Sequence, residues 1–194
     1  MPSHAKPSSL VPAFALMLAL LVPEVAVAAD GKPDFSGTWT FVRQRSDDLS
    51  QKVAESVGPA STASGKKSEQ VRVWIRSWLE GLAEDPKNRV LTIVQTPTEF
   101  KAGLGDEVNI YYFGREATSQ GPGGGNNKVT VAWQGSQIVT EERQTKGKGR
   151  IKAVYTLQPG GRALQVDWRL EHDSMKQPLE VRLAFDRADH VPDR

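Results

Sequence analysis

Alternation of apolar and polar residues along the second half of the chain predicts β-strands. From Arg89 onward, apolar side chains recur at every second position, and turn residues such as those of Pro159-Gly160-Gly161 separate the runs. The expected strands are residues 89–96, 99–104, 108–113, 116–120, 128–134, 137–145, 150–158, 163–171 and 179–187. In the last three, one face is apolar and the other carries charged residues. These strands are therefore expected to have one buried and one solvent-facing side.

A first strand and a helical segment precede this region. Residues 37–42 are rich in β-branched and aromatic side chains, which favour a strand, and residues 46–84 then change to helical spacing. A short helix carries Leu49 and Val53, and a second helix is indicated by apolar residues at positions 71, 74, 75, 78, 79 and 82. Trp74 and Trp78 lie one turn apart on it. Their spacing favours ordinary packing on the sheet, and framing a portal for an apolar ligand is the alternative.

The order of these elements predicts a mainly β fold. Sequential strands with short turns favour an antiparallel meander, and closure of half-buried strands removes the exposed edges of a sheet. We therefore expect one domain over residues 30–194, an antiparallel up-and-down β-barrel of about nine or ten strands with a two-helix insert between the first and second strands. A two-sheet sandwich is the alternative.

Residues 1–29 have the pattern of a secretory signal peptide. Lys6 precedes the apolar run from Val11 to Val22, and the small residues Ala26-Val27-Ala28-Ala29 follow. As a helix this run reaches only about 18 Å, whereas the apolar core of a bilayer is about 30 Å thick. We therefore expect a periplasmic or secreted protein without stable membrane insertion.

The composition of the chain argues against several kinds of functional site. The chain has no cysteine and three histidines, which argues against disulfides, thiolate sites and a multi-histidine metal centre, so neither a metal nor a cofactor is expected. Its 25 basic and 23 acidic residues lack the basic excess typical of nucleic-acid binding. His172-Asp173-Ser174 contains the residue types of a catalytic triad, but adjacent residues cannot adopt its geometry, so no enzymatic activity is expected.

The segment Phe35-Ser36-Gly37-Thr38-Trp39 resembles the Gly-x-Trp signature of the calycins, the superfamily of lipocalins and fatty-acid-binding proteins. The ending Phe185-Asp186-Arg187-Ala188 is similar to their closing strand, and the resemblance extends from Asp34 to Ala188. The chain also looks like exported bacterial lipocalin-like proteins. The resemblance implies that Trp39 closes one end of a barrel and that Arg187 stacks on it.

The resemblance does not extend to the ligand. Fatty-acid-binding proteins hold the carboxylate of their ligand with an Arg and a Tyr, and the matching positions here are Leu183 and Phe185. A free fatty acid is therefore not expected to bind with a charge-paired head group. We expect Phe185 and Tyr112 to line the ligand space, with whichever face of residues 111–113 is inward supplying the lining.

Glu141 and Glu142 form an adjacent pair on a predicted strand, so they should point to opposite faces. Exposure at a strand end is favoured because carboxylates are rarely buried unpaired. If one of them points inward, it needs an arginine, a hydroxyl or a water as partner.

Taken together, the sequence predicts a non-enzymatic exported protein that binds a small, largely apolar ligand in a β-barrel. The alternative is a structural or protein-interaction module of the cell envelope with a filled barrel, whose protein partner the sequence does not identify. An internal cavity would favour the first function, and an apolar patch on the outer surface would favour the second.

Export is expected to remove the first 28 or 29 residues, because Ala26-Val27-Ala28 and Val27-Ala28-Ala29 both present small residues to signal peptidase. Intact-mass measurement on the exported protein should show this loss. A membrane-bound form that retains Met1 to Val22 would contradict the prediction.

Overall fold

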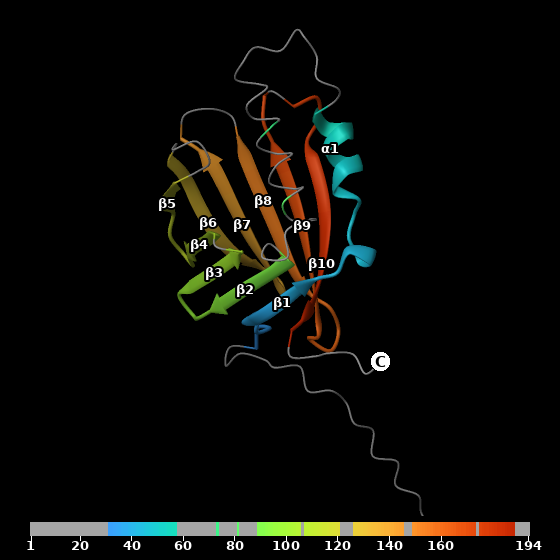
Figure 1. The fold of residues 1–194 in the computed structure, drawn as a ribbon. Helices are drawn as coiled ribbons and strands as arrows, with labels where there is room; N and C mark the ends of the chain where they lie inside the picture. The colour runs from blue at the N-terminus through green and yellow to red at the C-terminus, as the bar shows by residue number, and fades with distance from the viewer. Residues whose placement is uncertain are drawn as a thin grey trace, which may run out of the picture.

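Ten antiparallel strands form one strongly curved sheet that is nearly closed into a barrel (Figure 1). This computed structural model describes residues 31–57, 73, 81, 89–105, 107–120, 126–145, 149–173 and 175–188. The strands are β1 (Gly37–Phe41), β2 (Val90–Gln95), β3 (Glu99–Leu104), β4 (Glu107–Tyr112), β5 (Ala117–Gln120), β6 (Asn126–Gln134), β7 (Gln137–Gln144), β8 (Arg150–Leu157), β9 (Ala163–Glu171) and β10 (Leu179–Arg187). A 3-10 turn, η1 (Arg43–Arg45), and a helix, α1 (Leu49–Val57), lie between β1 and β2.

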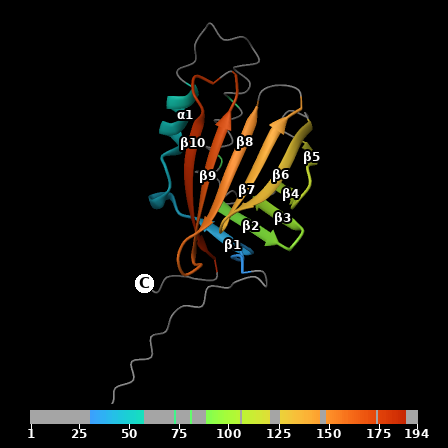
Figure 2. The ribbon, with the colours of Figure 1, turned by 180° about the vertical axis from the view of Figure 1, so that it is seen from behind.

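The strand order is β4-β3-β2-β1-β10-β9-β8-β7-β6-β5, so the first and last strands are neighbours. The two remaining edges, β4 and β5, approach each other, and an isolated bridge joins Phe113 to Val131 of β6 at this seam. Figures 1 and 2 show the two faces of this arrangement. The predicted up-and-down barrel of nine or ten strands is confirmed, and the alternative of a two-sheet sandwich is not.

Alternating side chains fill the inside of the sheet. On β10, Leu179, Val181 and Leu183 are buried, whereas Glu180 and Arg182 between them are exposed. The same period of two repeats on β6 and β9, because successive residues of a strand point to opposite faces. The apolar core therefore lies inside the barrel, and the charged residues of these strands face outward.

One end of the barrel is closed by Trp39 and Arg187. The indole of Trp39 is fully buried, and its Nε1 donates a hydrogen bond to the carbonyl of Phe35 over 3.0 Å. The guanidinium carbon of Arg187 lies 4.4 Å from the centre of the indole ring. Arg187 also donates to the carbonyls of Ser36 at 2.9 Å and Gly161 at 3.2 Å. Arg187 thus stacks on Trp39 as the resemblance implied, and it ties β10 to the segments around both neighbouring strands.

Gly37 leaves room for this contact. Its φ of 140° lies in the region that residues with a side chain rarely adopt, and a Cβ there would stand 2.9 Å from Nη1 of Arg187. The first position of the Gly-x-Trp signature therefore requires glycine for both backbone and steric reasons.

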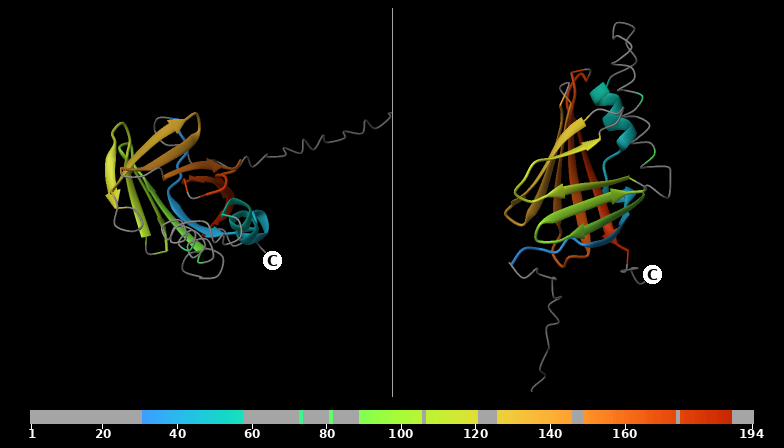
Figure 3. Two further views of the ribbon diagram at one scale, coloured as in Figure 1. Left: turned by 90° about the horizontal axis from the view of Figure 1, so that it is seen from above. Right: turned by 90° about the vertical axis from the view of Figure 1, so that its left-hand side faces the viewer.

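Helix α1 packs beside β10 through its apolar face (Figure 3). Leu49 and Val53, four residues apart, are buried against the sheet. At the start of the helix, Oδ1 of Asp48 accepts a hydrogen bond from the backbone N–H of Gln51 over 3.1 Å. The predicted first helix is therefore confirmed, with Asp48 as its capping residue.

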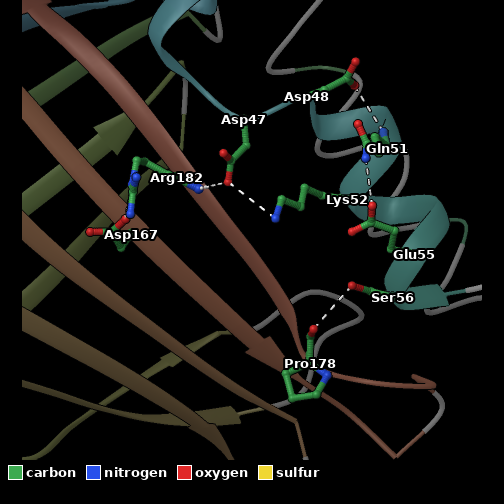
Figure 4. A network of polar contacts seen from close by, with 9 residues as sticks. All are labelled: Asp47, Asp48, Gln51, Lys52, Glu55, Ser56, Asp167, Pro178 and Arg182. Atoms are coloured by element: carbon green, nitrogen blue, oxygen red, sulfur yellow. Dashed lines mark hydrogen bonds and ion pairs between the residues drawn. The ribbon is translucent and has the colours of Figure 1, made fainter.

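Polar contacts at both ends attach α1 to β10 and the segment before it (Figure 4). The carboxylate of Asp47 accepts the backbone N–H of Arg182 over 2.9 Å, and the hydroxyl of Ser56 donates to the carbonyl of Pro178 over 3.3 Å. The helix is thus held along its whole length against the last strand of the barrel.

The second predicted helix lies outside the described residues, except for Val73 and Gly81, which are helical. Trp74 and Trp78 therefore have no described position, and the predicted signal peptide over residues 1–29 also lies outside the described residues. No helix within the described ranges is long and apolar enough to cross a bilayer.

We expect Trp39→Ala to lower the free energy of unfolding by about 3 to 5 kcal/mol, because it removes a fully buried ring and the partner of Arg187. Chemical denaturation measures this change. The adjacent Thr40→Ala, on the exposed face of the same strand, is the control and should change stability by less than about 0.5 kcal/mol. Equal effects of the two substitutions would contradict the role of Trp39 as the end plug.

Candidate functional site

A small group of polar side chains interrupts the apolar interior of the barrel. The hydroxyl of Tyr111 on β4 donates a hydrogen bond of 2.6 Å to Oε1 of Glu142 on β7, although Tyr111 is only 3% exposed. Thr140 and Tyr155, both buried, lie beside them. We call Tyr111, Thr140, Glu142 and Tyr155 the interior polar cluster. It joins strands from both sides of the seam between β4 and β5.

Strand alternation explains why Glu142 points inward. Ile138 and Thr140 are buried on the inner face of β7, and Glu142 continues this face. Glu141 points outward, where it forms ion pairs with Arg143 and Arg150. Of the two adjacent glutamates, one therefore faces the interior, although exposure was favoured for the pair. Of the three kinds of partner expected for an inward glutamate, an arginine, a hydroxyl or a water, the structure shows a hydroxyl, that of Tyr111.

Burial fixes the protonation state of the two phenols. Removal from water raises the pKa of Tyr111 well above its usual value, and Tyr155 and Glu142 nearby raise it further. Burial also raises the pKa of Tyr155, with a smaller contribution from Glu142, while Thr140 opposes the shift in both tyrosines. Both phenols are therefore neutral hydrogen-bonding groups at neutral pH, and Tyr111 remains a donor to Glu142.

Two further polar atoms face the interior without a partner. Asn127 on β6 is 4% exposed and shares the inner face with Val129 and Val131. Its Oδ1, and the hydroxyl of Ser119 on β5, are buried and have no hydrogen-bond partner among the described residues. Ser119 pairs with Asn127 across the two strands, and Glu142 pairs with Val129, two residues farther along β6. These polar groups therefore occupy one region of the barrel wall.

This region lies at the end opposite the Trp39–Arg187 plug. Glu142 pairs with Ile151, next to the turn between β7 and β8. Gly161, which accepts a hydrogen bond from Arg187, lies in the turn between β8 and β9, at the other end of β8. The interior therefore has an aromatic closed end and a polar end.

Phe185 and Tyr112, which were both expected to line the ligand space, lie on different sides of the barrel wall. Phe185 is buried in the core, 5.8 Å from the ring of Phe41. Tyr112 pairs with Glu99 on the outer face, and the guanidinium of Arg115 lies 3.9 Å from its ring centre. The structure therefore places Tyr111 rather than the expected Tyr112 inside the barrel, because the inward residue of β4 is the one that pairs with buried Phe100.

Sequence reasoning found only part of the polar group. In the expected strand over residues 150–158, alternation puts Tyr155 on the same apolar face as Ile151 and Ala153, and the structure places Tyr155 inside the barrel. Thr140 and Asn127 were missed, because a polar residue at an inward position looks like a break in the apolar pattern. Extending the alternation of Val129 and Ile138 through their own strands would have placed both residues inside.

A hollow of about 290 Å³ lies on the outer surface of β8 and β9 and is lined by Arg150, Lys152, Arg169 and Glu171. Arg150 is bound to Glu141 at 2.9 Å, and Arg169 to Glu171 at 2.6 Å. Nε of Arg150 is buried and has no partner among the described residues. Both guanidinium groups nevertheless have carboxylate partners, so the hollow is a weaker candidate for a binding site than the interior. Over the described ranges, no group of three His, Asp or Glu residues could hold a metal ion.

We expect Tyr111→Phe to lower the free energy of unfolding by about 1 to 3 kcal/mol, because it leaves Glu142 without its hydroxyl donor inside the barrel. Thermal or chemical denaturation checks this. Tyr112→Phe, which makes the same change on the outer face of the same strand, should cost less than about 0.5 kcal/mol. If the two variants are equally stable, the Tyr111–Glu142 contact does not form in solution.

Comparison with protein-family models and with the curated proteins finds no match. Among solved structures, the chain is similar to a secretory abundant heat soluble protein from Ramazzottius varieornatus, with a TM-score of 0.50 and 10% identity over 79% of this chain and 95% of that one. It is also similar to apo lipid binding protein 8 from Caenorhabditis elegans, with a TM-score of 0.51 and 11% identity over 79% of this chain and 94% of that one. At this identity the likeness concerns the fold alone. The chain therefore shares with these two proteins the fold of an antiparallel β-barrel.

Proposed function

We propose that the chain is a non-enzymatic binding protein that holds a small, largely apolar ligand inside its barrel. The observation that carries this proposal is that two buried atoms beside the interior polar cluster, Oδ1 of Asn127 and Oγ of Ser119, have no hydrogen-bond partner among the described residues. Buried polar atoms without a partner cost free energy, and a ligand that pairs with them offsets this cost. The polar end therefore has the chemistry of an orienting site within an apolar pocket.

The remaining wall supports an apolar ligand. Phe100, Ile138, Val166 and Leu183 present buried apolar side chains from different strands of the barrel. Barrels of about eight strands either fill their interior or hold one small ligand, and a larger strand number leaves more room. The structural neighbour from Caenorhabditis elegans is named a lipid binding protein, which supports a ligand of this class. Neither neighbour's name is that of an enzyme.

The proposal includes export. The pattern of Lys6, the apolar run from Val11 to Val22 and the small residues before Asp30 supports removal of a leader and a periplasmic or secreted location. The intact-mass measurement described above tests this part independently of ligand binding.

A second candidate function, a structural or protein-interaction module, is favoured by one observation. Val94, Val108 and Ile110 lie on the outer face of β2 and β4 and are 48%, 60% and 41% exposed. Val94 and Ile110 both pair with Lys101 of β3, so the apolar positions lie on neighbouring strands. Exposed apolar side chains grouped in this way are typical of contact surfaces.

Binding of methyl laurate, an uncharged twelve-carbon ester, tests the proposed function. Native mass spectrometry of the exported protein is expected to show one ester per chain. Ala153→Leu adds bulk to the inner face of β8, beside Thr140 and Trp168 on the neighbouring strands, and should weaken binding by at least about tenfold. Lys152→Leu makes an apolar change on the outer face of the same strand and should leave binding unchanged.

Thermal denaturation of both variants shows whether they remain folded. Equal binding by folded Ala153→Leu and the unchanged protein would place the ester outside the barrel. Absence of ester binding, together with self-association or partner capture that depends on Val108, would instead support the interaction module.

A further inference from the structure

The polar end of the barrel interior is rich in hydrogen-bond acceptors. Glu142 contributes a carboxylate, of which Oε1 accepts the Tyr111 hydroxyl at 2.6 Å. Oδ1 of Asn127, on a residue that is 4% exposed, can only accept a hydrogen bond and has no donor among the described residues. The hydroxyl of Ser119 faces the same region, and it also has no hydrogen-bond partner among the described residues.

Basic side chains on the surrounding strands point away from this region. Lys128 on β6 is exposed and paired with Glu116 at 2.7 Å, and Arg143 on β7 is exposed and paired with Glu141. Arg150 on β8 also binds Glu141 on the outer face. Over the described residues of β6, β7 and β8, no lysine or arginine therefore faces inward. On β10, Leu183 and Phe185 fill the buried positions with apolar side chains.

We propose that the ligand carries a hydrogen-bond donor, a hydroxyl or an ammonium group, at the polar end of an apolar chain, and that Glu142 and Asn127 accept from it. This inference rests on the proposed function and specifies the ligand class of the same site. An N–H or O–H group pairs with Oδ1 of Asn127 and with the carboxylate of Glu142, whereas an ionised carboxylate group cannot donate to either and meets the like charge of Glu142. The site therefore favours a donor over the carboxylate of a fatty acid.

Tyr111 positions the carboxylate in this arrangement. Its hydroxyl holds Oε1 of Glu142 from β4, while the backbone of β7 fixes the other end of the side chain. Phe100, whose ring centre lies 5.0 Å from that of Tyr155 and 6.2 Å from that of Tyr111, packs against both phenols. The carboxylate is thus held at one place on the wall, which favours recognition of a donor at a fixed depth in the barrel.

Three probes of equal chain length test this specificity: 1-dodecanol, dodecylammonium and dodecanoate, with methyl laurate as the reference that has only acceptors. Isothermal titration calorimetry on the exported protein should show that the alcohol and the ammonium bind at least about tenfold more tightly than dodecanoate. Methyl laurate should bind more weakly than the alcohol. Dodecanoate binding as tightly as the two donors would overturn the proposal.

Glu142→Gln and Glu141→Gln form a matched pair of variants, because the two residues are adjacent on β7 and point to opposite faces. Glu142→Gln should weaken dodecylammonium binding at least about tenfold and reduce the preference over dodecanoate. Glu141→Gln should change neither. Equal effects of the two variants would overturn the assignment of Glu142.

The outcomes separate this inference from the proposed function. If methyl laurate binds inside the barrel but the donors show no advantage, the binding function stands and the ligand class is wrong. If none of the four probes binds, both proposals fail. Thermal denaturation of Glu142→Gln shows whether a loss of binding reflects a loss of folding.

Discussion

The pairing of the first strand with the last is the constraint on which the rest of the structure depends. β1 lies between β2 and β10, so its backbone pairing makes β2, β3 and β4 continuous with the strands from β10 to β5. Trp39 pairs with Arg187 across this junction, and the guanidinium covers the buried indole. Without this contact the sheet has two additional open edges and no enclosed interior. The site on β4 to β7 therefore depends on residues at the opposite end of the barrel.

The two ends of the interior differ in chemistry, which gives a bound molecule a direction. Near the plug, the ring of Trp133 lies 6.0 Å from that of Phe35 and stacks on Phe113 at 5.8 Å. At the other end, Glu142 and Asn127 provide polar atoms. An amphiphilic ligand therefore gains most when its apolar chain points toward the plug and its polar group remains at the polar end.

The sequence was sufficient to predict the barrel but not its polar wall. Strict alternation from Leu179 to Phe185, together with the Gly37 and Trp39 signature, predicted both the strands and their closure. For Tyr111 and Tyr112, both faces of the strand carry an aromatic ring, and only pairing with Phe100 decides which ring is inside. That pairing is a long-range contact, and a shift of one residue exchanges the two faces. Side-chain alternation therefore identified the strands without settling the orientation of β4.

The polar atoms inside the barrel fall into two groups that have different explanations. Tyr111 and Glu142 satisfy each other, so folding alone accounts for them as a buried contact between β4 and β7. Asn127 is different, because its Oδ1 is removed from water by folding and receives no donor from the described chain. A valine, which fits a β-strand and has no polar side-chain atom, would avoid this cost. The asparagine there fits the proposed binding function, in which a donor on the ligand reaches an atom that the described residues leave without a partner.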